Sequence, residues 1–261
     1  MSNRTLFLAW RDAGSSKKWF PVGRLDADVE RSEYRFRYIS GAKRAKEEVG
    51  FPELIEFPSL QGDYRSSELF PLFKNRVMNP SRPDFKEYLR GLDLTGQADA
   101  IQILSVNGGI RVTDAYEVFP RIMRDQDGRF KCRFLLHGQR HVSSAARKRV
   151  RSLEAGEKLY ATLELTNPAT RLAVQMQTTD YHMIGWAPRY LVYDLSKTMA
   201  NEPGDCRVKV VRTTTRYTST KPSVLIEMSA PWPTHELMSR PDFRPLVGST
   251  EVWDDDEATV S

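Results

Sequence analysis

The sequence contains only two cysteines, Cys132 and Cys206, among 261 residues. Two thiols are too few for a disulfide framework or a cysteine-rich zinc site. No apolar run approaches the roughly 20 residues of a membrane-spanning helix, and the first residues lack the basic-then-apolar order of a signal peptide. We therefore expect a cytoplasmic protein with reduced thiols and no membrane attachment. Nothing in the composition indicates its oligomeric state.

Motifs of the common nucleotide-binding and hydrolytic sites are also absent. The chain has no GxxxxGK[ST] phosphate loop, no GxGxxG after a strand and no GxSxG nucleophile turn. His137 and His141 stand four positions apart, but at a strand-to-loop transition with no third ligand close in sequence. The sequence thus predicts no catalytic residue, no metal site and no cofactor.

One group of acidic residues keeps an enzymatic alternative open. A metal-dependent nuclease needs carboxylates that converge on a divalent ion beside a lysine, as Glu154, Glu157, Lys158 and Glu164 could do. Glu157 and Lys158 follow Gly156, where a predicted helix gives way to a strand and charged side chains normally face water. Binding is therefore favoured over catalysis.

What the chain does have is a localised basic stretch at residues 129–151. This stretch carries eight Lys or Arg residues and no Asp or Glu, whereas the net charge of the whole chain is only +5. A local cationic surface suits a polyanion, because each neutralised phosphate releases condensed counterions. A merely solvated charged face is the alternative, and composition alone does not decide between them.

Hydrophobic periodicity predicts an α+β protein made of two small modules. In the first, alternation predicts strands at 6–10, 19–25 and 34–38, followed by helices at 42–49, after Ser66 or Ser67, and from Ser81. Asn107-Gly108-Gly109 is a strong turn signal between the apolar segments 101–104 and 110–112. These segments suggest a small mixed sheet with helices.

The second module has its own pattern of strands and helices. A turn at 125–128 precedes a strand at 130–136, a helix from Ser143 or Ser144 to Leu153, and strands at 158–165, 172–177 and 181–186. A helix from Pro188 to Leu195 and strands at 207–213 and 223–228 follow. We expect modules at 1–122 and 129–246 and an acidic, flexible tail at 247–261.

Residues 134–195 resemble the HIRAN domain, a small β-barrel module with short helices. The similar pieces are FLLHGQRHV at 134–142, GEKLYATLELTNPATRLAVQM at 156–176 and IGWAPRYLVYDL at 184–195. Their order follows the family: a Gly before Arg, a Gly-Glu before a strand, an Asn-Pro turn, and a Gly that closes the last hairpin. Characterised eukaryotic members grip the 3′ end of single-stranded DNA.

The resemblance implies which residues would contact DNA. Arg140 and His141 occupy the positions where a phosphate pairs and a base stacks, Asn167 keeps the Asn of the Asn-Pro turn, and Trp186 follows Gly185 at a nucleotide-contacting position. Together with the predicted helix, the implied nucleic-acid-binding set is Arg140, His141, Arg147, Lys148, Arg149, Arg151, Asn167, Thr170, Arg171, Trp186 and Arg189.

This sequence departs from the family pattern in the turn after Asn167. Ala169 and Thr170 stand where the family usually has an aromatic residue or another side chain followed by Asp, and Leu172 replaces a frequent Asn. In the family, that Asp is expected to accept a hydrogen bond from the terminal hydroxyl of the DNA, and this chain lacks it. Backbone and stacking contacts are therefore expected to survive better than recognition of a free 3′ end.

Residues 5–115 resemble the N-terminal subdomain of HipA-type toxin kinases. The similar pieces are VGRL at 22–25, YRFRYI at 34–39 and the segment 57–94, in which LFPLFKNR at 69–76 is the most characteristic. The catalytic elements of the kinase itself are absent. In that family the subdomain packs against the kinase and helps to contact a DNA-binding antitoxin, so the resemblance implies a protein partner.

These observations predict a non-enzymatic protein that binds DNA, either single-stranded or at a 3′ end, in DNA repair or phage defence. The second module would hold the DNA and the first a protein partner. A regulatory, antitoxin-like protein of a HipA-type toxin system is the main alternative, and a nuclease is a third. The sequence leaves open DNA against RNA, the partner's identity and the role of residues 206–246.

Overall fold

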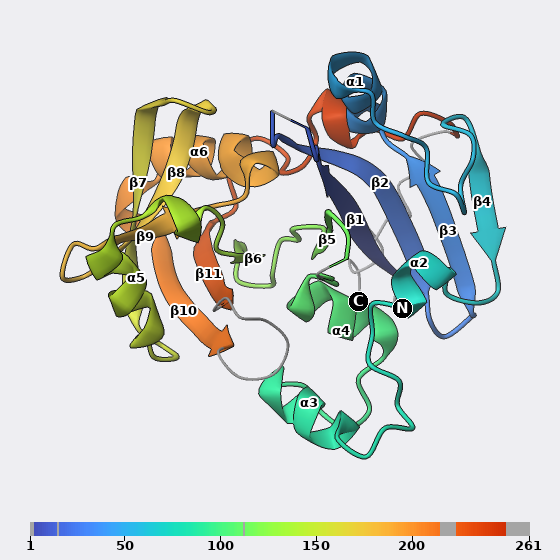
Figure 1. Ribbon diagram of the computed structural model, residues 1–261, viewed down its shortest axis with the longest axis horizontal. Coiled ribbons are helices and arrows are strands. Elements are labelled where there is room, and N and C mark those ends of the chain that lie inside the picture. The colour runs from blue at the N-terminus through green and yellow to red at the C-terminus, as the bar shows by residue number, and fades with distance from the viewer. Residues whose placement is uncertain (1–2, 15, 112, 215–222, 249–261) are drawn as a thin grey trace, which may run out of the picture. The chain divides into compact units, whose positions relative to one another are not determined.

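The computed structural model of the chain describes residues 3–14, 16–111, 113–214 and 223–248. It divides into two compact units (Figure 1). Unit 1 comprises residues 1–121 and 239–261, and unit 2 comprises residues 122–238. Residues 239–246, which the sequence analysis assigned to the second module, thus cluster with unit 1. The expected acidic tail lies, apart from residues 247 and 248, outside the described residues.

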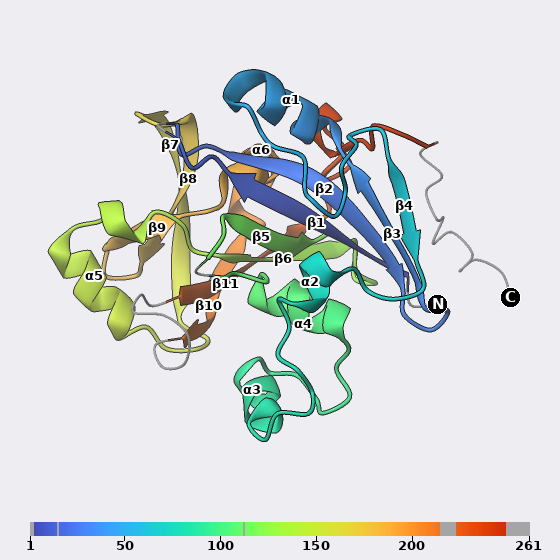
Figure 2. The same cartoon turned by 45° about the vertical axis from the view of Figure 1, so that its right-hand side comes forward.

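Unit 1 is built on a five-stranded antiparallel sheet in the order β4-β3-β2-β1-β5. Figure 2 shows β1 to β4 side by side. All four pairings are antiparallel, so the expectation of a mixed sheet was wrong. The strands are β1 (Asn3–Arg11), β2 (Trp19–Asp28), β3 (Glu33–Tyr38), β4 (Asp63–Ser66) and β5 (Tyr116–Pro120).

One face of this sheet packs into the main core of unit 1. Leu6, Leu25 and Phe36 lie opposite one another in β1, β2 and β3 and are fully buried. Phe57 stacks on Phe36 with ring centroids 3.9 Å apart. The segments between the strands supply the rest of this core, because burial of large aromatic rings is strongly favourable. The opposite face carries arginines and aspartates on β2, β3 and β4, whereas on β1 and β5 it carries the buried Phe7 and Phe119, which pack against Phe243.

Four short helices belong to unit 1: α1 (Ser40–Val49), α2 (Pro71–Lys74), α3 (Phe85–Gly91) and α4 (Ala100–Asn107). The turn signal at Asn107-Gly108 ends α4, since Gly108 takes the left-handed conformation that closes a helix. Asp99 begins α4 with a capping box, in which its side chain accepts from the Gln102 N–H. The apolar segment 101–104 is therefore helical.

Unit 2 is built on a six-stranded antiparallel sheet in the order β6-β11-β10-β7-β8-β9. Its strands are β6 (Arg129–Leu135), β7 (Lys158–Asn167), β8 (Arg171–Thr178), β9 (Met183–Trp186), β10 (Arg207–Thr214) and β11 (Ser223–Pro231). The expectation of a closed barrel was wrong: β6 and β9 are the two ends of the strand order and do not pair with each other as strands, so the sheet is open. A single bridge between His137 and Trp186 joins the segment after β6 to β9.

The helices of unit 2 are α5 (Ser144–Arg151) and α6 (Val192–Asn201). Ser143 caps α5 by accepting from the Ala146 N–H at 3.1 Å. This helix packs beside β9, as both views show (Figures 1 and 2). Among the described residues of both units, no helix is long and apolar enough to cross a lipid bilayer.

Candidate nucleic-acid interface

Strand register places aromatic and polar side chains together on one face of β7, β8 and β9. Tyr160 of β7 lies opposite Gln177 of β8. Gln175 lies two positions before Gln177, on the same face, and is opposite Trp186 of β9. Glu164 shares the face because it lies four positions beyond Tyr160 in β7. The sheet thus presents Tyr160 and Trp186 on one side.

Trp186 is held in a fixed position but is only half-buried. Its main chain exchanges two hydrogen bonds with His137, at 2.9 and 3.0 Å. Gly138 lies against the six-membered ring of the indole, where a Cβ would stand 2.3 Å from the Cε3 atom of Trp186. Since Gly138 also has a φ of +73°, both space and backbone conformation require glycine here. The indole is therefore neither sealed in the core nor mobile on the surface.

Glu164 connects Trp186 to the turn between β7 and β8. Its Oε2 accepts from the Trp186 Nε1–H at 2.7 Å and from the Asn167 amide at 2.9 Å. Burial would raise the pKa of Glu164, but hydrogen bonds from Asn167, Trp186 and Gln175 outweigh burial and lower that pKa. A fixed carboxylate therefore sits beside the indole, which suits hydrogen bonding to a base or hydroxyl better than contact with phosphate.

Asn167 organises the turn that follows β7. Its Oδ1 accepts from the backbone N–H groups of Ala169 and Thr170, at 3.0 and 3.1 Å, and from the Thr170 hydroxyl at 3.0 Å. This is the side-chain turn typical of Asn. The hydroxyl proton of Thr170 is thus committed to Asn167, and only its oxygen remains to accept. Arg171, exposed and with a φ of +63°, ends the turn.

Arg140 and His141 lie in a 3₁₀ turn (Gln139–His141) directly after Gly138, and this turn packs against β9. Both side chains are exposed, and the Nε of Arg140 donates to Nε2 of His141 at 2.8 Å. The imidazole therefore orients the guanidinium. Arg189 follows Trp186 by three positions, is half-buried, and begins the 3₁₀ turn Arg189–Leu191.

Helix α5 supplies further positive charge beside β9. Its Ala146 and Val150 are buried, whereas Arg147, Lys148 and Arg151 are exposed. The Nη1 of Arg147 donates to the Val142 carbonyl at 2.7 Å, which anchors one edge of its guanidinium. The helix therefore presents cations to solvent.

Arg149 differs from its neighbours in α5. It bonds to Glu157 and, at 3.1 Å, to Asp180. These contacts raise its pKa, Glu157 most, and fix α5 to the start of β7 and to the turn before β9. Its charge is already compensated inside the protein, so the structure gives Arg149 an internal role.

The first part of the basic stretch is also compensated. Arg133 in β6 donates to Glu227 in β11 at 2.7 Å, and Lys209 in β10 reaches the same carboxylate at 3.1 Å. Arg129 donates to the Asp205 carbonyl at 3.0 Å. Residues 129–133 therefore belong to a charge-paired part of the sheet, and the basic stretch does not form one continuous patch.

Two exposed tyrosines were not among the expected contact residues. Tyr160 and Tyr181 are 47% and 76% exposed, and their rings stack with centroids 6.0 Å apart at 25°. One indication for Tyr160 came from the sequence: side chains alternate between the two faces of a strand, so Tyr160 lies on the face opposite its neighbour Leu159. In the structure Leu159 is buried. The position of Tyr181 depends on a turn with a φ of +65° and had no comparable signal.

The residues of the nuclease alternative do not converge. Glu157 is bound to Arg149, and Glu164 is held by Trp186 and Asn167. Within the described parts of the chain, no three His, Cys, Asp or Glu side chains are grouped so that they could hold a metal ion.

Comparison with known families matches residues 130–229 to the HIRAN domain model. Unit 2 carries a HIRAN domain. The match covers less than half of the chain, and it extends the expected 134–195 to include β10 and β11, which lie between β6 and β7 in the sheet. Part of the segment 206–246 is thereby assigned to the HIRAN domain.

Two solved structures resemble the chain at 15% sequence identity. The crystal structure of the HIRAN domain of human HLTF covers 41% of this chain and 81% of its own, with a TM-score of 0.31. A crystal structure of a protein from Lactobacillus plantarum covers 40% and 99%, with a TM-score of 0.30. Among curated proteins, the comparison finds no match.

Proposed function

We propose that the protein binds single-stranded DNA through the β7–β8–β9 face of its HIRAN domain, with no catalytic step. The observation that carries the proposal is the placement of Trp186 and Tyr160 on one sheet face, beside the exposed cations of the Arg140 turn and α5. Aromatic platforms with a bordering positive groove are the usual means of binding single strands.

The two kinds of side chain divide the work of binding. Phosphates would pair with Arg140, Arg147, Lys148 and Arg151, whose side chains are exposed. Bases would stack on the aromatic rings, at about 1–3 kcal/mol for each base. Glu164, fixed beside the indole, accepts hydrogen bonds and so favours base edges or a sugar hydroxyl at this point.

A free 3′ end would meet a weaker acceptor here than in the family pattern. Thr170 replaces the expected Asp and already donates its proton to Asn167. It can accept one hydrogen bond without contributing charge. We therefore propose strand binding with only a small preference for a free 3′ hydroxyl.

Fluorescence anisotropy with labelled single-stranded, duplex and 3′-overhang DNA, measured across a range of salt concentrations, tests this proposal. Affinity should fall steeply with salt and be higher for the single strand and the overhang than for the blunt duplex. Absence of binding at low ionic strength would refute the proposal. Equal affinity for duplex and single strand would show that binding depends on the cations alone, without stacking of bases on the aromatic rings.

A nuclease activity is distinguished by a separate measurement. Incubation of the same oligonucleotides with magnesium should leave them intact. Cleavage that is lost in Glu157→Ala would overturn the non-enzymatic assignment, although that variant also breaks the Arg149 ion pair, so Arg149→Met serves as its control.

The proposed protein partner of unit 1 requires a surface other than the segment 69–76. Leu69, Phe70 and Phe73 of that segment are buried in the core of unit 1, so they are not a docking face. The alternative of a HipA-type regulatory protein, with a role in defence or repair, rests on the resemblance of unit 1 alone. Co-purification with a separate kinase would support it.

A further inference from the structure

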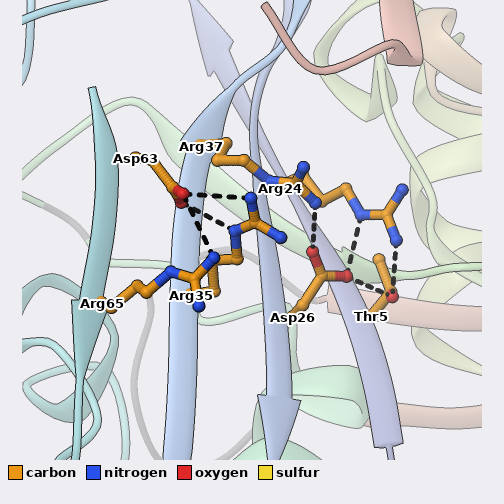
Figure 3. Close-up of polar contacts among 7 residues, drawn as sticks. All are labelled: Thr5, Arg24, Asp26, Arg35, Arg37, Asp63 and Arg65. Carbon is orange, nitrogen blue, oxygen red and sulfur yellow. Dashed lines mark hydrogen bonds and ion pairs between the residues drawn. The ribbon is translucent and has the colours of Figure 1, made fainter. Parts of the chain in front are cut away.

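The polar face of the unit 1 sheet carries an unusual concentration of arginine (Figure 3). Strand register forms two rows across β2, β3 and β4. Arg24 lies opposite Arg37, which lies opposite Asp63; Asp26 lies opposite Arg35, which lies opposite Arg65. Since like charges placed directly across neighbouring strands repel, the Arg24–Arg37 pair calls for a specific compensation. The arginine cluster is defined by Arg24, Arg35, Arg37 and Arg65.

The carboxylates within the cluster compensate only half of its charge. Asp26 accepts from the Nε of Arg24 at 2.8 Å and from the Nη2 of Arg37 at 2.9 Å. It also accepts from the Thr5 hydroxyl at 2.7 Å. One carboxylate thus serves two guanidinium groups (Figure 3).

The second carboxylate is shared in the same way. Asp63 accepts from the Nε and Nη2 of Arg35, at 2.7 and 3.0 Å, and from the Nη2 of Arg65 at 3.4 Å. Among the residues drawn in Figure 3, four arginines stand against two aspartates, which is a formal surplus of two positive charges; Asp28 and Glu33 lie one pair further along the same face.

Arg37 is the residue that this surplus affects most. Only 1% of its side chain is exposed, and its Nε and Nη1 atoms are buried without a hydrogen-bond partner among the residues that the structure describes. Burial lowers the pKa of Arg37, the bond to Asp26 opposes that change, and the charges of Arg35 and Arg24 reinforce it. A buried cation with unpaired donors is costly unless an anion joins it.

Gly248 lies against two guanidinium groups of the cluster. A Cβ on Gly248 would stand 2.8 Å from Nη2 of Arg35 and 3.2 Å from Nη1 of Arg37. The backbone at Gly248 has a φ of +81° and lies against these two guanidinium groups. The residues that follow in the sequence include Glu251, three consecutive aspartates at 254–256, and Glu257.

We propose that the arginine cluster is an oxyanion-binding site of unit 1, in which a carboxylate or phosphate group pairs with Arg37 and Arg35. Guanidinium groups bind both anions by paired, charge-assisted hydrogen bonds. Two sources offer this chemistry: the acidic side chains of residues 251–257 of the same chain, and a phosphate group from solution. The proposal does not rest on DNA binding by the HIRAN domain.

Thermal unfolding of the full-length protein in inorganic phosphate, against chloride at equal ionic strength, tests the site. Where the site is open to it, phosphate at roughly five times its dissociation constant should raise the unfolding temperature by about 2–4 °C. Arg37→Met and Arg35→Met should each abolish this shift. Arg82→Met, which removes the same charge from an exposed ion pair elsewhere in unit 1, should retain it.

A neutralised full-length variant separates the two sources. It carries Glu251→Gln, Asp254→Asn, Asp255→Asn, Asp256→Asn and Glu257→Gln. If the chain's own carboxylates fill the site, phosphate shifts only this variant, and the variant without phosphate unfolds at a lower temperature than the natural protein. If phosphate is the ligand, both proteins respond equally.

Two results would overturn the proposal. One is the absence of any phosphate shift in both proteins, together with no loss of stability on neutralisation. The other is a shift that persists in Arg37→Met and Arg35→Met, which would show that phosphate acts elsewhere as an adventitious ion only. Should Arg37→Met fail to fold, the half-buried Arg35 supplies the same test by itself.

Discussion

The two parts of the basic stretch 129–151 are both rich in cations and free of carboxylates, but most of their cations have different environments. In β6, Arg129 and Arg133 are paired with Asp205 and Glu227, which are distant in the sequence. In the Arg140 turn and α5, Arg140, Lys148 and Arg151 are exposed. A run of positive charge is therefore no measure of a binding surface, because its availability depends on the carboxylates that folding brings to it.

The largest effect should come from separating these two parts by mutation. Replacing Arg147, Lys148 and Arg151 together by Gln should reduce the slope of log affinity against log salt by about 2, since each phosphate contact on a single strand contributes ~0.7. At ~0.1 M salt this corresponds to about 100-fold weaker binding. Anisotropy titrations at several salt concentrations measure both quantities.

The matched control removes the same number of charges from β6. Arg129, Lys131 and Arg133 replaced together by Gln should lower the slope by at most about 0.7, because two of the three are paired with carboxylates of the protein. If this control lowered the slope as much as the α5 variant does, net charge rather than placement would govern binding, and the comparison would fail.

Loss of the indole should have the next largest effect. Trp186→Ala removes a stacking platform and is expected to weaken binding of single-stranded DNA by about 10- to 100-fold, with the salt slope nearly unchanged. Trp186→Phe keeps a ring and should lose less, although Glu164 then lacks its Nε1–H donor. An unchanged affinity in Trp186→Ala, in a variant that unfolds at the natural temperature, would move the site away from β9.

A smaller effect is expected on the stability of the fold, through the carboxylate that pairs with Arg133 in β6. Burial would raise the pKa of Glu227, but Arg133 and Lys209 outweigh burial and lower it below its ordinary value of 4.5. A carboxylate with a lowered pKa stabilises the fold above its unfolded pKa and loses that contribution as pH falls through the lower folded pKa. Urea unfolding between pH 7 and pH 3 should therefore show declining stability in acid.

Glu227→Gln should flatten that decline, whereas Glu154→Gln, at an exposed position, should leave it intact. An equal decline in Glu227→Gln and the natural protein would mean that other carboxylates carry the acid sensitivity of the HIRAN domain.

Local patterns predicted most strands and the cap of α5, because alternation and the Ser143 cap depend on neighbours in sequence. They assigned no element to the apolar segment 101–104, which is helical because Asp99 and Gln102 form a capping box before it and Gly108 ends the helix after it. The open strand order of unit 2 depends on pairing between distant strands, which periodicity does not specify.

The residues of the candidate site also divide into those that the sequence indicated and those whose position depends on contacts between distant segments. Trp186, Arg140 and Asn167 are predicted contact residues through the HIRAN resemblance, and the structure joins Trp186 to Asn167 through Glu164. The internal pairing of Arg149 with Asp180 could not be predicted, since it joins residues 31 positions apart. The arginine cluster of unit 1 also depends on register between strands rather than on a local motif.

The smallest expected effect concerns the end of the DNA strand. Because the Thr170 hydroxyl donates to Asn167, it can only accept from a 3′ hydroxyl, and its contribution is that of one neutral hydrogen bond, about 0.5–1.5 kcal/mol. Oligonucleotides ending in a 3′ hydroxyl should thus bind only about 2- to 10-fold more tightly than the same sequences ending in a 3′ phosphate. Thr170→Val, which keeps the shape of the side chain, should remove this preference while leaving internal strand binding intact. A preference much larger than this, or one that persists in Thr170→Val, would identify another acceptor for the terminal hydroxyl, and Glu164 beside Trp186 is the carboxylate placed to provide it.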